Sequence, residues 1–502
     1  MPSQDTAAAT SPDAAISAAP DDVVKRLLID GQLVTAERTF PSINPATGEI
    51  FGYAPDASVE QAEQAILAAR RAFDTTDWST NVAFRQRCLE QLYQALRDDV
   101  EELRELTITE VGATVVLTKG NQLEIPIEIV RYYADLLKTY SFTEDLGVVD
   151  VRGTKHHRWL EKEAGGVVAA IAAYNYPHQL ALAKLAPALA AGCTVVLKGA
   201  PDTPLSTLAL GEIIARTDIP AGVVNVLGGT EIAVGELLTT HPAVDAVTFT
   251  GSTPVGRKIM AAASDTLKRV FLELGGKSAA VVLDDADFQQ AAQFVGFSIV
   301  THAGQGCALT SRMLVPRQHH DEIVELVKAN FGMVRYGDPH NPKTYMGPLI
   351  SEKQRDKVDG LVQRAVAEGA TLAFGGEKVE PGFFYQPTLL ANVHPDSEIA
   401  QEEVFGPVLA VIPFDDDDDA VAIANNSQYG LSGGVFSGDQ ERAKAVARRI
   451  RTGTFSINGG NYFSADVPFG GFKQSGIGRE SGIAGMEEFL EIKALAEVAQ
   501  NV

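Results

Sequence analysis

Short apolar runs alternate with helical segments from Gly165 onward, and this alternation constrains the fold more than any other feature of the chain. The runs GGVVAAIAAY, CTVVLKG, GVVNVLGG and AVTFTG are nearly continuous in apolar residues. Strands of that kind, separated by helices, form βαβ units in a parallel sheet that is buried on both faces. A second such series runs from KSAAVVL through RMLVP and PVLAVIPF to GTFSIN. The pattern predicts two doubly wound α/β domains with a cleft between them.

The length of the chain also favours more than one domain, because 502 residues exceed what a single hydrophobic core serves. Residues 1–22 are rich in small residues and have neither the basic start nor the apolar centre of a leader peptide, so we expect a disordered tail. No later stretch offers about twenty uninterrupted apolar residues. We therefore expect a cytoplasmic protein that does not enter a membrane.

Net charge and cysteine spacing argue against several function classes. The formal charge of -23 opposes binding to a phosphate backbone, so we expect no nucleic-acid partner. Cys88, Cys193 and Cys307 are far apart, with no CxxC pair and no His/Cys cluster, which argues against a disulfide framework and a zinc site. We interpret Cys88 and Cys193 as packed thiols, and the run from Asp415 to Asp419 as a solvated turn that caps a helix. We expect a reducing compartment and no metal.

Three residues could carry chemistry, and each has an ordinary structural alternative. Cys307 in GQGCALTSR is either a nucleophile or a small buried hydrophobe. Glu273 ends an apolar segment before two glycines, where burial raises a carboxyl pKa toward the range of a general base, but an N-cap or a salt-bridge partner fits equally. Asn175 follows an apolar strand, where its amide could stabilise an oxyanion or form a turn.

The segment AVTFTGSTPVGRKI has the order of an apolar strand, a tight turn and a helix. Free N–H groups and the positive end of the helix dipole make such a turn a natural phosphate site. The spacing of Gly251 and Gly256 does not match GxGxxG, so an ordinary strand-to-helix turn stays open as an interpretation. By itself this segment does not identify a cofactor site.

Eight motifs occur together in one order and spacing: INPATGE, YNYP, VVLKGAPDTPLS, FTGSTPVG, LELGGKS, GQGC, EEVFGPV and PFGGFKQSGIGRE. With them the chain resembles the aldehyde dehydrogenase superfamily, from about Leu27 to the C-terminus. The resemblance implies two Rossmann-related α/β domains with a small β oligomerisation hairpin. It also implies an NAD(P)-dependent enzyme that oxidises an aldehyde to a carboxylic acid.

The resemblance assigns roles to the residues that match its motifs. Cys307 matches the nucleophile, which forms a thiohemiacetal and then a thioester, and Asn175 matches the amide that holds the oxyanion. Glu273 matches the base that activates water to hydrolyse the thioester. Lys184 and Glu480 match residues that lie behind these three and pass the proton away from the site.

The same resemblance implies a cofactor site built from several loops, which explains why the glycine spacing does not match GxGxxG. Lys198 matches the contact to the adenosine ribose, Glu403 the contact to the nicotinamide ribose, and Phe405 the side chain that packs on the ring. The full set of implied cofactor residues is Tyr174, Lys198, Gly251, Ser252, Leu274, Glu403 and Phe405. Where relatives often carry a glutamate that repels a 2′-phosphate, this chain has Pro201, so NADP stays possible beside NAD.

We expect the dinucleotide-binding domain to comprise residues 23–141 and 165–275, and the catalytic domain residues 276–473. Residues 142–164 and 474–502 would form bridging segments, with the C-terminal strand IKALAEVAQ pairing across subunits of a homodimer or homotetramer. This arrangement is an implication of the resemblance and not of the residue pattern.

The sequence lacks two features that would bind a charged aldehyde, and this narrows the range of expected substrates. Trp78 and Trp159 match no pocket position, so an aromatic box for a quaternary ammonium aldehyde is incomplete, and the segment INGGNYFSADVPFGG holds no arginine for a substrate carboxylate. We expect a neutral aliphatic or aromatic aldehyde. Two rival functions stay open: transfer of the acyl group to CoA, which the presence of Glu273 disfavours, and a catalytically silent binding protein that kept the fold.

Overall fold

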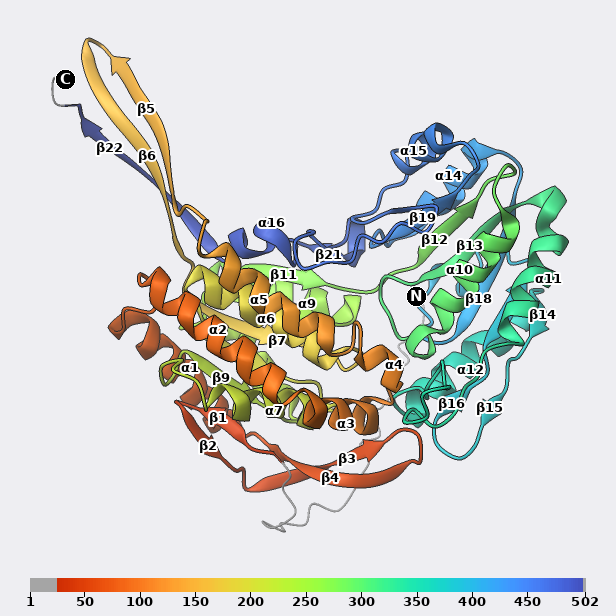
Figure 1. Cartoon of the computed structure of the whole chain (residues 1–502), viewed down its shortest axis with the longest axis horizontal. Coiled ribbons are helices and arrows are strands. Elements are labelled where there is room, and N and C mark those ends of the chain that lie inside the picture. The colour runs from red at the N-terminus through yellow and green to blue at the C-terminus, as the bar shows by residue number, and fades with distance from the viewer. Residues whose placement is uncertain (1–24, 500–502) are drawn as a thin grey trace, which may run out of the picture.

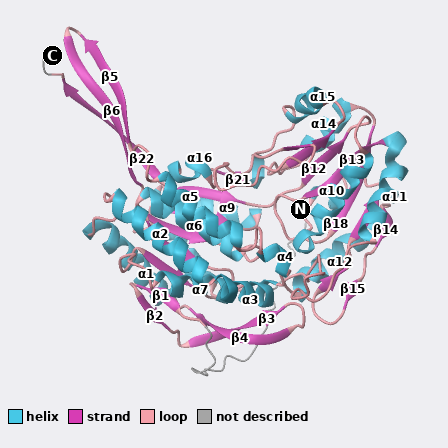
Figure 2. Ribbon diagram, viewed as in Figure 1, coloured by secondary structure: helices cyan, strands magenta, loops and turns pink. Residues whose placement is uncertain are grey.

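The computed structural model describes residues 25–499, which form two α/β lobes side by side and an arm that projects from one of them (Figure 1). The expected tail over residues 1–22 lies outside the described residues. Each lobe has its own apolar core, one built around the first sheet and one around the second. Helices flank the strands in both lobes (Figure 2), so the predicted fold class is confirmed.

The first lobe contains an eight-stranded sheet with the order β2-β1-β9-β8-β7-β10-β11-β21. Strands β9, β8, β7, β10 and β11 are parallel and have the Rossmann order 3-2-1-4-5, which places a switch in direction between β7 and β10. The strands are β1 (Leu27–Ile29), β2 (Gln32–Val34), β7 (Val167–Ile171), β8 (Thr194–Lys198), β9 (Val224–Leu227), β10 (Ala246–Thr250), β11 (Arg269–Glu273) and β21 (Gly476–Ile477).

Helices cover both faces of this sheet as the Rossmann topology requires. The helices that follow β7 and β8 pack on one face, and those that follow β9 and β10 lie on the other beside α1. The helices of this lobe are α1 (Val59–Thr75), α2 (Val82–Asp98), α3 (Val100–Val111), α4 (Val115–Thr118), α5 (Glu124–Leu136), α6 (Pro177–Ala191), α7 (Pro204–Ile214), α8 (Ile232–Thr240) and α9 (Thr253–Ala263), with a 3-10 turn at Ser264–Thr266. The continuous periodicity of residues 83–106 predicts one helix, but the backbone breaks at Asp99 (φ -93°, ψ 7°) between α2 and α3.

The second lobe contains a seven-stranded sheet with the order β14-β17-β18-β13-β12-β19-β20, parallel except for β14. The strands are β12 (Ser278–Val282), β13 (Thr310–Pro316), β14 (Thr371–Phe374), β17 (Thr388–Ala391), β18 (Val408–Phe414), β19 (Gly433–Phe436) and β20 (Ser456–Ile457). The helices are α10 (Phe288–Val300), α11 (His320–Phe331), α12 (Glu352–Ala367), α13 (Glu398–Gln401), α14 (Asp417–Asn425) and α15 (Gln440–Ala447), with 3-10 turns at Thr301–Gly304, Arg317–His319 and Lys473–Ser475. Two short hairpins complete the fold: β3 (Arg38–Asn44) with β4 (Glu49–Asp56), and β15 (Lys378–Val379) with β16 (Phe384–Tyr385).

The arm is a three-stranded antiparallel sheet of β5 (Thr143–Val151), β6 (Thr154–Ala164) and β22 (Leu490–Val498) (Figure 1). One edge of β22 pairs along its whole length with β6 of its own chain, and the expected pairing across subunits stays a prediction for the other edge. Helix α16 (Gly482–Glu487) returns the chain to the base of the hairpin, where Gly165 N–H donates to the Phe489 carbonyl at 2.9 Å. The pairing joins the two ends of the arm although β6 and β22 lie far apart in the sequence.

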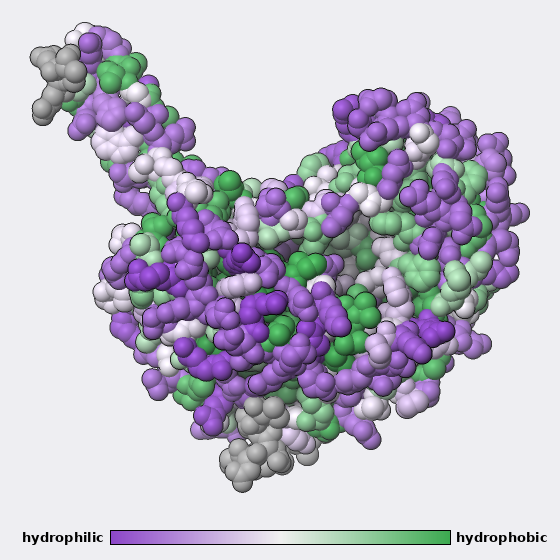
Figure 3. Space-filling model, viewed as in Figure 1, coloured by the Kyte–Doolittle hydropathy of each residue, from purple (hydrophilic) through white to green (hydrophobic). Residues whose placement is uncertain are grey.

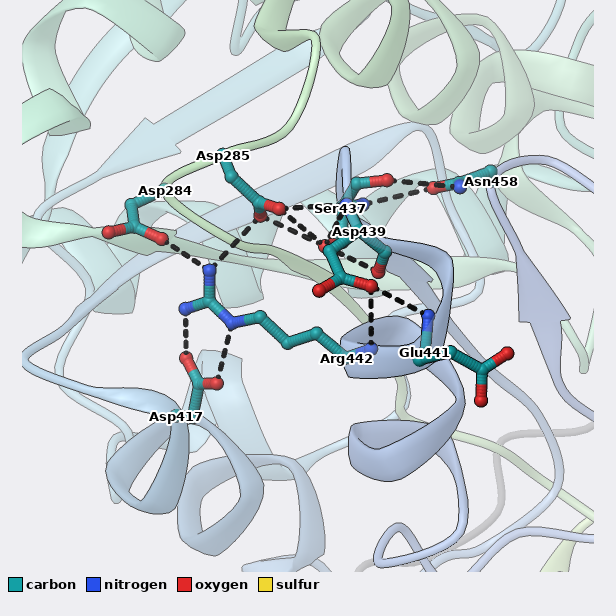
Figure 4. A network of polar contacts seen from close by, with 8 residues as sticks. All are labelled: Asp284, Asp285, Asp417, Ser437, Asp439, Glu441, Arg442 and Asn458. Carbon is teal, nitrogen blue, oxygen red and sulfur yellow. Dashed lines mark hydrogen bonds and ion pairs between the residues drawn. The ribbon is translucent and has the colours of Figure 1, made fainter.

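The acidic run at the start of α14 belongs to a polar network around Arg442 (Figure 4). The guanidinium of Arg442 donates two hydrogen bonds to Asp417 (2.6 and 2.9 Å), and it also donates to Asp284 (2.7 Å) and Asp285 (3.2 Å). The Asp416 side chain accepts from the Asp419 N–H as the N-cap of α14, which confirms the capping interpretation. The network joins α14 and α15 to the end of β12.

Between residues 25 and 499, no group of three or more His, Cys, Asp or Glu residues is arranged to hold a metal ion. Within the same residues, no helix combines the length and the apolar character needed to cross a membrane.

Candidate active site

A cavity of about 420 Å³ brings together three residues that lie far apart in the sequence, Asn175, Glu273 and Cys307. Asn175 follows β7 and Glu273 ends β11, both at the carboxyl edge of the first sheet, where open α/β sheets bind ligands. Cys307 comes from the second lobe, in the loop between α10 and β13. The cavity therefore combines residues from both lobes.

The loop that carries Cys307 has a tightly specified backbone. His302 (φ 49°), Ala303 (φ 52°) and Gly304 (φ 74°) adopt left-handed conformations one after another. A Cβ on Gly304 would lie 2.0 Å from the Gly406 carbonyl oxygen, and a Cβ on Gly276 would lie 2.2 Å from the Cys307 carbonyl oxygen. Glycine is required at both positions, because only its missing side chain admits these approaches.

Cys307 as a whole residue has intermediate exposure at the cavity, whereas Cys88 and Cys193 are fully buried. Burial raises the pKa of Cys307 above its ordinary value, and the negative charge of Glu273 raises it further. The resting side chain is therefore a neutral thiol, and it needs a proton acceptor to become a thiolate nucleophile. Burial raises the pKa of Cys88 and of Cys193 to about 11, which fits their interpretation as packed thiols.

Glu273 is 5% exposed, and neither of its carboxylate oxygens has a hydrogen-bond partner in the described structure. Burial raises its pKa well above the ordinary value, and the nearby carboxylate of Glu480 adds to this effect. The cations Lys184 and Arg479 lower the pKa in part. The structure excludes the N-cap and salt-bridge alternatives for Glu273 and leaves a desolvated carboxyl that faces the cavity.

The side chain of Asn175 is held from one side and free on the other. Its Nδ2 donates to the Gln305 carbonyl at 2.9 Å, and its backbone carbonyl accepts from Gln122 Nε2 at 2.9 Å. An amide NH₂ has two donors, so one N–H of Asn175 stays available to the cavity. That N–H can serve an oxyanion next to Cys307.

Lys184 and Glu480 form an ion pair in spite of being 296 residues apart. Lys184 on α6 is 1% exposed at its side chain, and Glu480 is 13% exposed and lines the cavity. Both groups influence the pKa of Glu273, so they lie within electrostatic reach of it. The ion pair therefore forms part of the charged surroundings of this carboxyl.

The expected contacts to the cofactor lie outside the cavity lining, around the ends of β8 and β10. Lys198 Nζ donates to the carbonyls of Gly199 (3.2 Å) and Gly229 (2.9 Å), and burial lowers its pKa to about 8. Gly251 N–H donates to the Glu273 carbonyl at 3.0 Å, and Ser252 precedes α9 without a side-chain capping bond. The N–H groups of Thr253 and Val255 in the first turn of α9 are thus not capped by Ser252, while Pro254 between them has none, and such a helix start can bind a phosphate.

Glu403 and Phe405 approach this region from the second lobe. Gly276 N–H donates to the Glu403 carboxylate at 2.9 Å, and burial raises the pKa of Glu403. The rings of Tyr174 and Phe405 meet edge to face with centroids 5.9 Å apart. Leu274 is 5% exposed, and its N–H donates to the Ser475 carbonyl at 2.9 Å. The contact between Tyr174 and Phe405 joins the two lobes near the buried carboxyl of Glu403.

The structure adds positions that the sequence did not single out. Gln122 and Gln305 are both 0% exposed, and both hold Asn175. Gln305 belongs to the GQGC motif, and its position two residues before Cys307 is the sequence signal that could have identified it. Nothing in the sequence around Gln122 marks it as part of a site.

Comparisons with known proteins agree with this geometry. The model of the aldehyde dehydrogenase family matches residues 33–495. A 3-succinoylsemialdehyde-pyridine dehydrogenase of a Pseudomonas species is 42% identical over 484 residues, which cover 94% of this chain and 98% of that protein. Betaine aldehyde dehydrogenase of Staphylococcus aureus, solved with NAD+, has a TM-score of 0.91 at 35% identity and 96% coverage of both chains. An AldC mutant of Pseudomonas syringae, solved with NAD+ and octanal, has a TM-score of 0.90 at 36% identity, with 96% of this chain and 98% of that chain covered.

Proposed function

The chain belongs to the aldehyde dehydrogenase family and oxidises an aldehyde with a nicotinamide cofactor, and we propose that Cys307, Glu273 and Asn175 perform the chemistry. The observation that carries this proposal is their convergence on one cavity from two lobes. The thiol supplies a nucleophile, the carboxyl a base, and the amide an oxyanion donor.

The first step is addition of the Cys307 thiolate to the aldehyde carbonyl, which gives a thiohemiacetal. The free N–H of Asn175 and the backbone N–H of Cys307 hold the oxyanion. Because the pKa of the thiol is raised, a proton acceptor must take its proton before or during the attack. Glu273 and Glu480 both line the same cavity, and either carboxylate can accept this proton.

The cofactor, when bound, accepts the hydride that leaves the former aldehyde carbon. Gly251, Ser252 and the first N–H groups of α9 would hold its pyrophosphate, and Lys198 its adenosine ribose. Glu403 would bind the nicotinamide ribose, with Phe405 against the ring. What remains on Cys307 is a thioester.

Hydrolysis of this thioester needs an activated water, and Glu273 accepts the proton from it. A carboxyl with a raised pKa is a stronger base in its ionised form than an ordinary glutamate. Lys184 and Glu480 then pass that proton away from the cavity. The acyl group leaves as a carboxylate, and the second proton of the water restores the Cys307 thiol.

For the cofactor we propose NAD, with NADP as an accepted alternative. The solved structures named above hold NAD+. Pro201, exposed beyond the end of β8, carries no charge that would repel a 2′-phosphate. The ratio of kcat/KM for NAD and NADP measures this preference directly.

For the substrate we propose a neutral aliphatic or aromatic aldehyde. The described residues that line the cavity include no Lys, Arg or His, so a substrate carboxylate would have no cation to pair with. The lining does include the aromatic side chains Tyr176, Phe294, Tyr462, Phe463 and Phe469. One relative is named for a pyridine-bearing semialdehyde, and the AldC mutant was solved with octanal.

The arm favours self-association. Its strands expose apolar side chains at Leu146, Val148, Val151, Ile492 and Val498, and Figure 3 shows hydrophobic and hydrophilic residues mixed over its surface. We propose that the arm and residues 474–499 contribute to a homodimer or homotetramer, and that the expected domain boundaries hold. Sedimentation equilibrium measures the assembly.

We further propose a cytoplasmic location, because the catalytic thiol requires a reducing compartment.

One experiment separates the proposed hydrolytic enzyme from its rivals. A panel of neutral, cationic and carboxylate-bearing aldehydes is supplied with NAD or NADP, with and without CoA, and formation of the reduced cofactor is followed by absorbance. Turnover with neutral aldehydes in the absence of CoA supports the proposal. An absolute requirement for CoA, or no turnover with any aldehyde, contradicts it.

A further inference from the structure

Gln305 is fully buried behind the nucleophile and satisfies hydrogen bonds in three directions. Its Nε2 donates to the carbonyls of His302 (3.2 Å) and Pro348 (3.4 Å). Its Oε1 accepts from the Ile350 N–H at 2.9 Å. The side chain thereby fastens the loop that carries Cys307 to the segment 348–350 of the same lobe.

The backbone of Gln305 makes a second connection, to the other lobe. Its carbonyl accepts the Nδ2 hydrogen bond of Asn175 at 2.9 Å, and its N–H donates to the His302 carbonyl at 3.1 Å. The bond to Asn175 fixes the plane of that amide, since one N–H is directed at Gln305 and the other must point away from it. One residue therefore sets both the loop of the nucleophile and the orientation of the oxyanion donor.

The loop needs such a fastening because its own backbone is unusual. His302 and Ala303 are not glycines and yet have positive φ, a conformation that costs free energy unless the surroundings impose it. Hydrogen bonds from the Gln305 main chain and side chain end on the His302 carbonyl, within this left-handed stretch. Loss of the side-chain amide would leave the Ile350 N–H and the Pro348 carbonyl without these partners in a buried place.

We propose that Gln305 is a positioning residue, whose buried amide aligns Cys307 with the oxyanion donor Asn175 across the two lobes. This inference rests on the proposed roles of Cys307 and Asn175. We assign Gln305 no contact with the substrate, because its side-chain nitrogen and oxygen form hydrogen bonds with backbone groups of neighbouring segments.

The test compares two buried amides of the same kind. Gln305→Met keeps the length of the side chain and removes its hydrogen bonds. Asn225 is the control, because it is also 0% exposed, donates to the Gly222 carbonyl and accepts from the Asp30 N–H, each at 2.9 Å, far from the cavity lining. We expect Gln305→Met to lower kcat by about 10²-fold with little change in the KM for aldehyde, as for a misplaced reacting group. Asn225→Leu destabilises the fold and leaves kcat near the wild-type value.

A double-mutant cycle with Asn175→Ala gives a readout that a merely structural residue would not move. If Gln305 acts through the oxyanion donor, the losses of the two single variants combine to less than their product. Wild-type kcat in Gln305→Met, or losses that multiply fully, would overturn the inference. Full kcat in Asn175→Ala would instead refute the proposed oxyanion role, and Gln305 would then have no donor to align. Should Gln305→Met fail to fold, Gln305→Glu keeps the shape and the acceptor for Ile350, and we expect the same loss of kcat.

Discussion

Replacement of Glu273 by glutamine separates the two halves of the reaction. The carboxyl is 5% exposed and neither oxygen has a hydrogen-bond partner among the described residues, so a neutral amide of the same shape fits in its place. Cys307 and Asn175 are untouched, and formation of the thioester should survive. Hydrolysis loses its base, which typically contributes about 10²-fold to 10⁴-fold, or about 3–5 kcal/mol of barrier.

Rapid mixing of Glu273→Gln with aldehyde and NAD is the assay. We expect a burst of reduced cofactor that approaches one equivalent per active site, followed by a steady-state rate reduced by the factor above. The control is Glu488→Gln, because burial also raises the pKa of Glu488 although it lies outside the cavity lining. A steady-state rate close to the wild type, or loss of the burst together with turnover, would refute the assignment of Glu273 to the hydrolytic step.

Three further predictions test other parts of the account. Asn175→Ala should lower kcat by about 10²-fold to 10³-fold through loss of an oxyanion donor, and an unchanged kcat would contradict that role. Glu480→Gln removes a negative charge that raises the pKa of Glu273, so the ionised base should persist to lower pH, and the pH profile of thioester hydrolysis should move downward. An upward move would contradict it. Arg442→Met should lower the free energy of unfolding in urea by about 1–2 kcal/mol, since the partners of Arg442 are partly exposed and screened, and the difference should shrink at high salt.

Much of the fold was predictable from local pattern. The alternation of apolar runs and helices correctly placed β7, β8, β9 and β10 and the helices between them. Each run is nearly continuous in apolar residues, as a strand that is buried on both faces requires. The break at Asp99 was not predictable, since apolar spacing continues through it. The partner of β22 could not be predicted either, because alternation within a strand does not identify its neighbour.

The candidate site was predictable only through the combination of motifs. On its own, Glu273 could equally have been an N-cap, and only the structure shows that its carboxylate lines the same cavity as Cys307 without a hydrogen-bond partner in the described part of the chain. The pairing of Lys184 with Glu480 spans 296 residues, a separation over which no local pattern reports a contact. Gln122 and Gln305 were missed for the same reason, since their role depends on backbone groups brought together by folding.

The most direct test of the central claim is to identify the residue that carries the acyl group. Glu273→Gln is mixed with aldehyde and NAD, quenched in acid after the burst, digested, and analysed by mass spectrometry of its cysteine peptides. The account predicts the acyl mass on the peptide that contains Cys307, with Cys88 and Cys193 unmodified. Reduced cofactor formed without an adduct on Cys307, or with the adduct on either buried cysteine, would contradict it.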